Sequence, residues 1–221
     1  MENENANYQF LNSDRAEKYF ADADIALKQG KHLQNYGNDS RIFSFVDEYF
    51  EKGLQEYYLR FFKMNLVRGT NDNQKFYYLD FPDDGKGKLG KENRSKELES
   101  DNVIFAILLL NMFNHKFFEN KEIEWSELDQ TFKEGEHKEL WQKLLFGKIK
   151  NNYTPTEEQS VKEKVKSILK DLEKLGWVEI KNLDEVKFEI MPSIERISRL
   201  YRDVIGNVDS ISEYLNNEQL S

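Results

Sequence analysis

The most constraining feature of the sequence is a glycine between a long amphipathic segment and two short alternating ones. Residues 157–175 repeat apolar side chains at steps of three and four, the period of an α-helix with one buried face, and Gly176 ends the repeat. Residues 177–181 and 186–190 then alternate apolar and polar side chains, which predicts a β-hairpin with one wet face. A helix that stops at a glycine just before a hairpin predicts a winged helix.

The segments before this hairpin fit the same domain. Helices are expected over residues 97–118, 126–132 and 136–146, with a short extended piece at 123–125 that runs into Ser126 as an N-cap. An amphipathic helix over 193–205 is expected to follow the hairpin. The order of helix, short strand, helices and hairpin is that of a winged helix.

The N-terminal half repeats the theme less clearly. A Ser-Asp pair predicts the start of a helix over 14–29 that stops at Gly30, and a long apolar stripe predicts a second helix over 41–62. Residues 64–67 and 76–81 predict a hairpin. We therefore expect a mainly α protein with small β-hairpins, an α+β fold of tandem winged-helix domains at 1–82 and 98–206, with a linker at 83–97 and a flexible polar tail at 207–221.

Composition narrows the function. The 221 residues include 41 acidic and 32 basic side chains, for a formal charge of −9, which argues against coating nucleic acid by bulk attraction. No cysteine is present, so disulfides and thiolate nucleophiles are excluded. The longest apolar run, at 103–110, is shorter than the roughly 18 residues of a membrane span, and no secretory signal opens the chain. We expect a cytoplasmic protein that contacts no membrane.

Catalytic patterns are poor. His137 has no second histidine at ligand spacing nearby, and the glycine- and lysine-rich stretch at 85–91 lacks the spacing of a phosphate-binding loop. No residues pair a nucleophile or base with an orienting partner. We expect a protein that is not an enzyme and uses no cofactor or metal.

The lysines of residues 157–190 are the candidate DNA contacts. Four recur at every fourth position of the expected helix and two lie on the expected hairpin: Lys162, Lys166, Lys170, Lys174, Lys181 and Lys187. They could follow a phosphate backbone. Acidic residues are interspersed among them, so the alternative is an ordinary solvated helix face.

Some apolar positions are candidates for contact with other proteins. The stripe over 41–62 is wider than one buried face needs, and the last helix adds two positions. Both a central core helix and a protein interface remain open. The interface candidates are Phe43, Phe50, Tyr58, Phe62, Ile197 and Tyr201.

Several segments resemble MukE-like proteins, in the same order along the chain. They are ALKQGKH at 26–32, FVDEYF at 45–50, NLVR at 65–68, FYYL at 76–79, EKVKS at 163–167, LGWV at 175–178 and FEI at 188–190. The chain lacks the long acidic tail of MukE itself, so it is more similar to the branch called MksE.

The resemblance implies a non-catalytic kite subunit of a bacterial condensin-like SMC complex. Such a subunit forms a homodimer, binds a MukF- or MksF-like kleisin and a MukB- or MksB-like SMC ATPase, and contacts double-stranded DNA for chromosome organisation and segregation. The resemblance also implies a nucleoid-associated location. Lys166 and Lys174 match basic positions of the family's C-terminal helix, whereas Lys162 and Lys170 extend the row by helical geometry.

Two other functions fit the same pattern. A winged-helix transcription regulator would bind duplex DNA alone and with sequence preference. A kite subunit of an SMC-type plasmid-defence system would share the fold and the partner classes.

Overall fold

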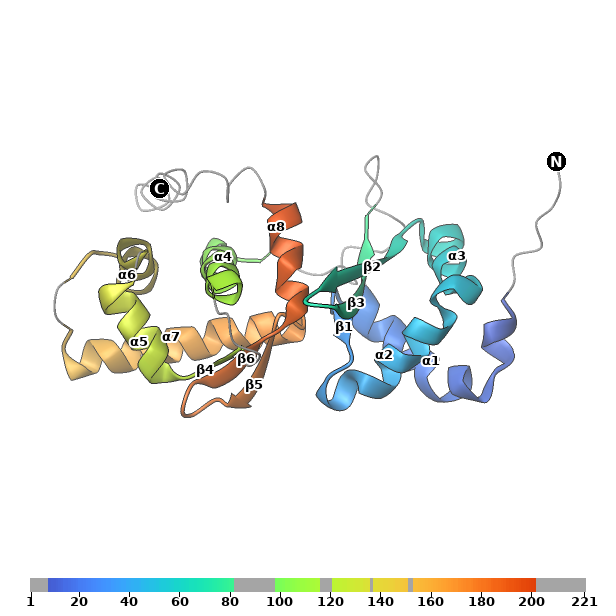
Figure 1. The fold of residues 1–221 in the computed structure, drawn as a ribbon, viewed down its shortest axis with the longest axis horizontal. Coiled ribbons are helices and arrows are strands. Elements are labelled where there is room, and N and C mark those ends of the chain that lie inside the picture. The colour runs from blue at the N-terminus through green and yellow to red at the C-terminus, as the bar shows by residue number, and fades with distance from the viewer. Residues whose placement is uncertain (1–7, 82–97, 116–120, 136, 151–152, 202–221) are drawn as a thin grey trace. The chain divides into compact units, whose positions relative to one another are not determined.

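A computed structural model describes residues 8–81, 98–115, 121–135, 137–150 and 153–201 of the chain (Figure 1). The chain divides into two compact units, Met1–Glu97 and Leu98–Ser221. Each unit has its own hydrophobic core and one small antiparallel sheet. The mainly helical α+β class is confirmed. The predicted linker at 83–97 and tail at 207–221 lie outside the described residues.

The first unit begins with a capped helix. After the 3-10 turn η1 (Gln9–Asn12), the Ser13 hydroxyl accepts a hydrogen bond from the Ala16 amide at 3.1 Å and starts α1 (Asp14–Lys28). Gly30, with φ 86°, allows the chain to turn away after the helix. Both ends agree with the prediction. The short strand β1 (Leu33–Gln34) and the 3-10 turn η2 (Gly37–Asp39) follow.

The single helix predicted over 41–62 is wrong. The structure has α2 (Ser40–Tyr49), the wide turn η3 (Phe50–Leu54), the short helix α3 (Gln55–Tyr57) and the π-helical turn η4 (Tyr58–Phe62). The break lies at Gly53, whose φ of 111° is open to glycine and disfavoured for other residues. Lys63, at φ 54°, ends the segment. The apolar stripe continues across the break, so periodicity alone did not reveal it.

The sheet of the first unit is longer than predicted. Strands β2 (Asn65–Asn71) and β3 (Gln74–Asp80) pair antiparallel from Asn65↔Asp80 to Asn71↔Gln74. Asp72 and Asn73 form the turn with φ 46° and 59°, the left-handed pair that suits a two-residue hairpin. Strand β1 pairs with the other side of β3, giving the order β1-β3-β2. Strand β2 is therefore an edge strand among the described residues.

The second unit follows the predicted order. It contains α4 (Ser100–His115), β4 (Glu122–Ile123), α5 (Trp125–Glu134), α6 (Lys138–Phe146), α7 (Pro155–Lys174), β5 (Val178–Asn182), β6 (Lys187–Ile190), the 3-10 turn η6 (Pro192–Glu195) and α8 (Arg196–Leu200). Its sheet has the order β4-β6-β5. Helix α5 begins one residue before the predicted Ser126 cap, with Glu124 in the N-cap position. Predicted helix residues 116–118 and 202–205 lie outside the described residues.

The long helix α7 has well-defined ends. The Thr154 hydroxyl accepts from the Glu157 amide at 3.3 Å, and the Glu157 carboxylate accepts from the Thr154 amide at 3.0 Å, which makes a capping box. At the other end the Trp177 amide donates to the Leu172 carbonyl and the Gly176 amide to the Glu173 carbonyl, with Gly176 at φ 74°. This Schellman turn leads directly into β5, as the glycine signal predicted.

Candidate functional site

The lysine row lies on α7, as the spacing predicted, but most of its charges are matched by carboxylates. Lys166 lies 3.1 Å from Glu163, and Lys174 lies 2.7 Å from Asp171. Within the described part of the chain, no ion-pair partner is seen for the exposed Lys170.

Lys162 has two contacts that hold it along the helix. Its Nζ lies 3.4 Å from the Glu158 carboxylate and 4.8 Å above the ring of Trp125, at the start of α5. The Trp125 indole in turn donates to Glu158 at 3.2 Å. This cation is engaged by its own unit, so binding a phosphate there would require exchanging these contacts.

The two hairpin lysines are more strongly matched. Lys187 on β6 lies 2.8 Å from Glu122 and 3.0 Å from Glu124 at the start of the unit's sheet. Hydrogen bonds to these two carboxylates raise the pKa of Lys187 above its ordinary value.

Lys181, on β5, lies 2.9 Å from Glu179 and 3.2 Å from Glu189. The two hairpin lysines thus face four glutamates between them. The sheet surface is acidic on balance, and the hairpin does not extend a positive strip from α7.

The aromatic interface candidates of the first unit are mostly in its core, which is one of the two interpretations that the stripe left open. Phe43, Phe50 and Tyr58 are buried. The ring of Tyr77 on β3 lies 5.6 Å from Phe43 and 5.0 Å from Phe50, so these side chains hold the hairpin against α2. Phe62 is partly buried, with the Lys28 ammonium 3.8 Å above its ring.

The two candidates on the last helix also pack in a core. Ile197 is fully buried in the core of the second unit, and Tyr201 is partly buried against that core. A stripe of apolar residues at helical spacing is satisfied by folding within one unit, and it does not identify a surface for another protein.

In the first unit, the exposed apolar side chains are sequence neighbours of the interface candidates Tyr58 and Phe62. Leu59 and Phe61, on η4, are about half exposed, at 51% and 50%. Phe61 lies 5.6 Å from the ring of Tyr8 and 5.4 Å from Tyr57. The break at Gly53 changes the phase of the helix, so the exposed positions could be found only by knowing where the helix breaks.

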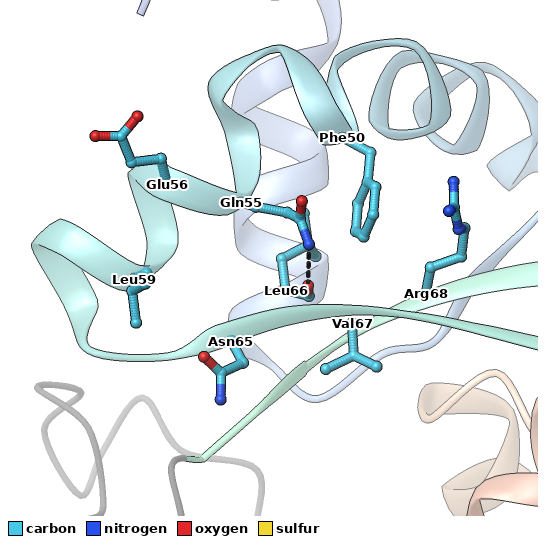
Figure 2. Close-up of a pocket in the computed structure, with 8 residues that line it drawn as sticks. All are labelled: Phe50, Gln55, Glu56, Leu59, Asn65, Leu66, Val67 and Arg68. Carbon is cyan, nitrogen blue, oxygen red and sulfur yellow. Dashed lines mark hydrogen bonds between the residues drawn. The ribbon is translucent and has the colours of Figure 1, made fainter. Parts of the chain in front are cut away.

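A groove lies between this broken segment and the edge strand β2 (Figure 2). The Gln55 side chain crosses it and donates to the Leu66 carbonyl at 3.4 Å. In Figure 2, Leu59 points toward β2 from the helical wall. The groove is lined by Phe50, Gln55, Glu56, Leu59, Asn65, Leu66, Val67 and Arg68.

Arg68 forms one end of the groove. Its guanidinium lies 5.0 Å from the centre of the Phe50 ring and 3.3 Å from the Glu51 carboxylate. Glu56 is exposed, and within the described residues it has no ion-pair partner. Once Arg68 and Glu51 are matched, the groove retains one unmatched negative charge.

The hairpin beside the groove is tied to α2 by a carboxylate. Asp47 accepts hydrogen bonds from the Tyr77 hydroxyl and, at 2.9 Å, from Lys75. Burial alone would raise the pKa of Asp47, but these two hydrogen bonds leave that pKa below its ordinary value. Burial and the bond to Asp47 raise the pKa of the Tyr77 hydroxyl. The contact fixes the strand that supports β2.

The part of the chain that the structure describes holds no group of three or more His, Asp or Glu side chains placed to share a metal ion. None of its helices is both long and apolar enough to span a bilayer.

Comparison with known families places the chain in its context. A family model described as the condensin complex protein MksE matches residues 18–201, most of the chain and parts of both units. No curated protein matches the sequence significantly.

Proposed function

Because the chain belongs to the MksE family of condensin complex proteins, we propose that it is a non-catalytic kite subunit of a bacterial SMC complex that acts in chromosome organisation and segregation. The observation that carries the proposal is the match over residues 18–201, which includes most of both units. In this role the chain binds and positions larger partners, and nucleotide hydrolysis belongs to the SMC subunit.

The proposal includes a tandem winged-helix architecture. Both units have the order helix, short strand, helices and hairpin, and in both the last strand lies in the middle of a three-stranded sheet. That order supports the winged-helix assignment. Because a scaffold does not define a function, the partners must be argued from the surfaces.

The proposed partners are a second copy of the chain, a kleisin and the heads of an SMC ATPase. Burial of Phe43, Phe50, Tyr58 and Ile197 leaves the exposed side chains Leu59 and Phe61 as better candidates for these contacts. Copurification with the proteins encoded beside its gene tests this role. Recovery of a kleisin is expected, and no recovery at micromolar concentration would contradict it.

We also propose that α7 contacts DNA within the assembled complex and that the protein is associated with the nucleoid. The matched lysines support contact in an assembly rather than alone, because engaging phosphate must displace carboxylates at Lys166 and Lys174. Lys166→Glu with Lys174→Glu is expected to weaken DNA retention by the complex while leaving the fold intact. Lys18→Glu with Lys138→Glu, on exposed helical positions elsewhere, makes the same change in net charge and is the control.

A mobility-shift titration of the purified chain completes the test. We expect no sequence-selective duplex binding by the chain alone, whereas a transcription regulator would bind at nanomolar concentration with steep salt dependence. Equal DNA retention in the two double variants would remove α7 from the interface. A kite subunit of a plasmid-defence system would give the same binding results, and retention of a test plasmid in cells with and without the gene separates it from chromosome segregation.

A further inference from the structure

The open edge of β2 has unused main-chain hydrogen-bonding groups beside a groove. The two-residue turn makes Asn71 and Gln74 the last hydrogen-bonded pair of the hairpin. The N–H and C=O groups of Asn71, and of every second residue before it (Gly69 and Val67), therefore point toward β3. The backbone groups of Leu66, Arg68 and Thr70 therefore point away from the sheet. The bond from Gln55 to the Leu66 carbonyl agrees with this direction.

Only the first of these outward-facing groups has a partner in the described part of the chain. Gln55 covers the Leu66 carbonyl, while no backbone bond from another element is seen there to Arg68 or Thr70. The groove wraps around the strand, because its lining includes Val67 from one face of β2 and Arg68 from the other. An extended chain could pair with this edge and place alternate side chains against both faces.

From this geometry we propose that the β2 edge binds an extended peptide segment of a partner protein by strand addition, and that the segment carries apolar and basic side chains. The apolar side chains would pack against Leu59 and Val67, which line the groove. A basic side chain would lie near Glu56, the charge left unmatched in the groove. Main-chain pairing supplies affinity and the side-chain contacts supply specificity.

A second copy of the chain suits this edge less well. Pairing of two β2 edges would bring together two grooves in which Arg68 is already paired with Glu51 and Glu56 is unmatched, so like charge would face like charge. A basic segment has the opposite charge. The proposal rests on the proposed function only in taking the partner to be another protein of the complex, and its first test needs no such subunit.

The test uses the full chain and a phage-displayed library of random 12-residue peptides. We expect enriched peptides that alternate apolar residues with lysine or arginine. On binding a synthetic copy of such a peptide, the Arg68 and Thr70 amides should exchange with deuterium more slowly. Thr70→Pro removes one outward N–H without removing a hairpin bond and should weaken binding about tenfold.

Two matched variants separate the hydrogen bond and the charge from general damage. Thr70→Val keeps the amide and should bind within about twofold of the wild type. Glu56→Lys should weaken peptide binding, whereas Asp22→Lys makes the same charge change on the exposed face of α1 and should not. Melting curves check that each variant is folded.

Several outcomes would overturn the proposal. The first two are absence of enrichment over an unrelated target and equal peptide binding by Thr70→Pro and Thr70→Val. The third is protection of amides other than those of β2. The fourth is a dimer of the chain that Thr70→Pro dissociates, because this would assign the edge to a second copy. If a kleisin copurifies equally with Thr70→Pro and Thr70→Val, the strand-addition site fails while the proposed function stands. If no kleisin copurifies but peptide binding behaves as expected, the proposed function fails while the strand-addition site stands.

Discussion

The two units share an order of elements and a strand order, but they use the residues between the short strand and the hairpin differently. In the first unit a glycine and a π-helical turn divide this segment, and the pieces form a groove beside an open strand. In the second unit the hairpin follows a single unbroken helix, α7, whose lysines lie against carboxylates. One arrangement offers main-chain and apolar contacts, and the other offers charges that are largely matched.

The difference shows that a repeated order of elements does not imply a repeated surface. The two cores are built from the same kinds of side chain, aromatic and aliphatic. The exposed side chains of the two units differ in kind. A binding role assigned to one unit should therefore not be carried over to the other.

The largest expected effect is on the core of the second unit. Leu172→Asp places a carboxylate at a fully buried position of α7 and should lower the stability of this unit by at least about 3 kcal/mol. Hydrogen exchange followed by mass spectrometry should show loss of protection in the second unit while protection of the first is retained. Ser167→Asp, on the exposed side of the same helix, is the control. Simultaneous loss in both units would show that their folding is not independent.

A smaller effect is expected in the hairpin of the first unit. A Cβ at Gly69 would lie 2.2 Å from the Phe76 ring on the paired strand, so Gly69→Ala must displace that buried ring. We expect a loss of about 1–3 kcal/mol from overpacking. Denaturant unfolding measures it, and Thr70→Ala at the exposed neighbouring position should cost less. Equal losses would mean that the ring moves freely.

The N-terminal cap of α7 should contribute less again. Thr154→Ala removes the side-chain acceptor of the capping box and should cost about 1 kcal/mol. Thr156→Ala, an exposed position within the first turn, serves as the comparison in the same thermal melts. A loss no larger than that of Thr156→Ala would show that the cap is not needed once the helix is packed.

The smallest effect concerns pH. Hydrogen bonds from Lys150 and from the Thr154 amide lower the pKa of Glu157 from 4.5 to about 2. A carboxylate whose pKa is lowered by folding stabilises the fold above its unfolded value, and the stabilisation is lost as pH falls through the folded value. Glu157→Gln should thus be less stable than wild type at neutral pH. The difference should shrink between about pH 4.5 and 2, and a constant difference would contradict it.

Much of the fold could be predicted from local signals. Ser13 acts through its own side-chain hydroxyl, and Gly30 and Gly176 act through their own backbone geometry, so the helix ends near them were predictable from a few residues. The strand β1 was not, because two residues carry no alternation. The break at Gly53 was missed since apolar spacing continued across it, and a glycine inside a helical pattern was the available signal.

The surfaces were less predictable than the elements. The spacing of four placed the lysines on α7, but the carboxylates that match Lys187 come from residues more than sixty positions away. Similarly, Phe50 has a helical spacing that fits either a core or an interface, and its contact with Tyr77 on β3 shows that it belongs to the core. Local patterns determine elements, whereas surface charge and exposure depend on contacts between them.

The π-helical turn η4, at Tyr58–Phe62, bears on how chain length can vary in this family. A π-helical turn holds an additional residue within an otherwise helical stretch, so deleting one residue there can be absorbed by tightening the turn. In α7 each residue advances the helix by about 100°. A deletion in α7 would rotate every later side chain out of register with the core. Insertions and deletions among homologues should therefore be tolerated near residues 58–62 and rare within 155–174.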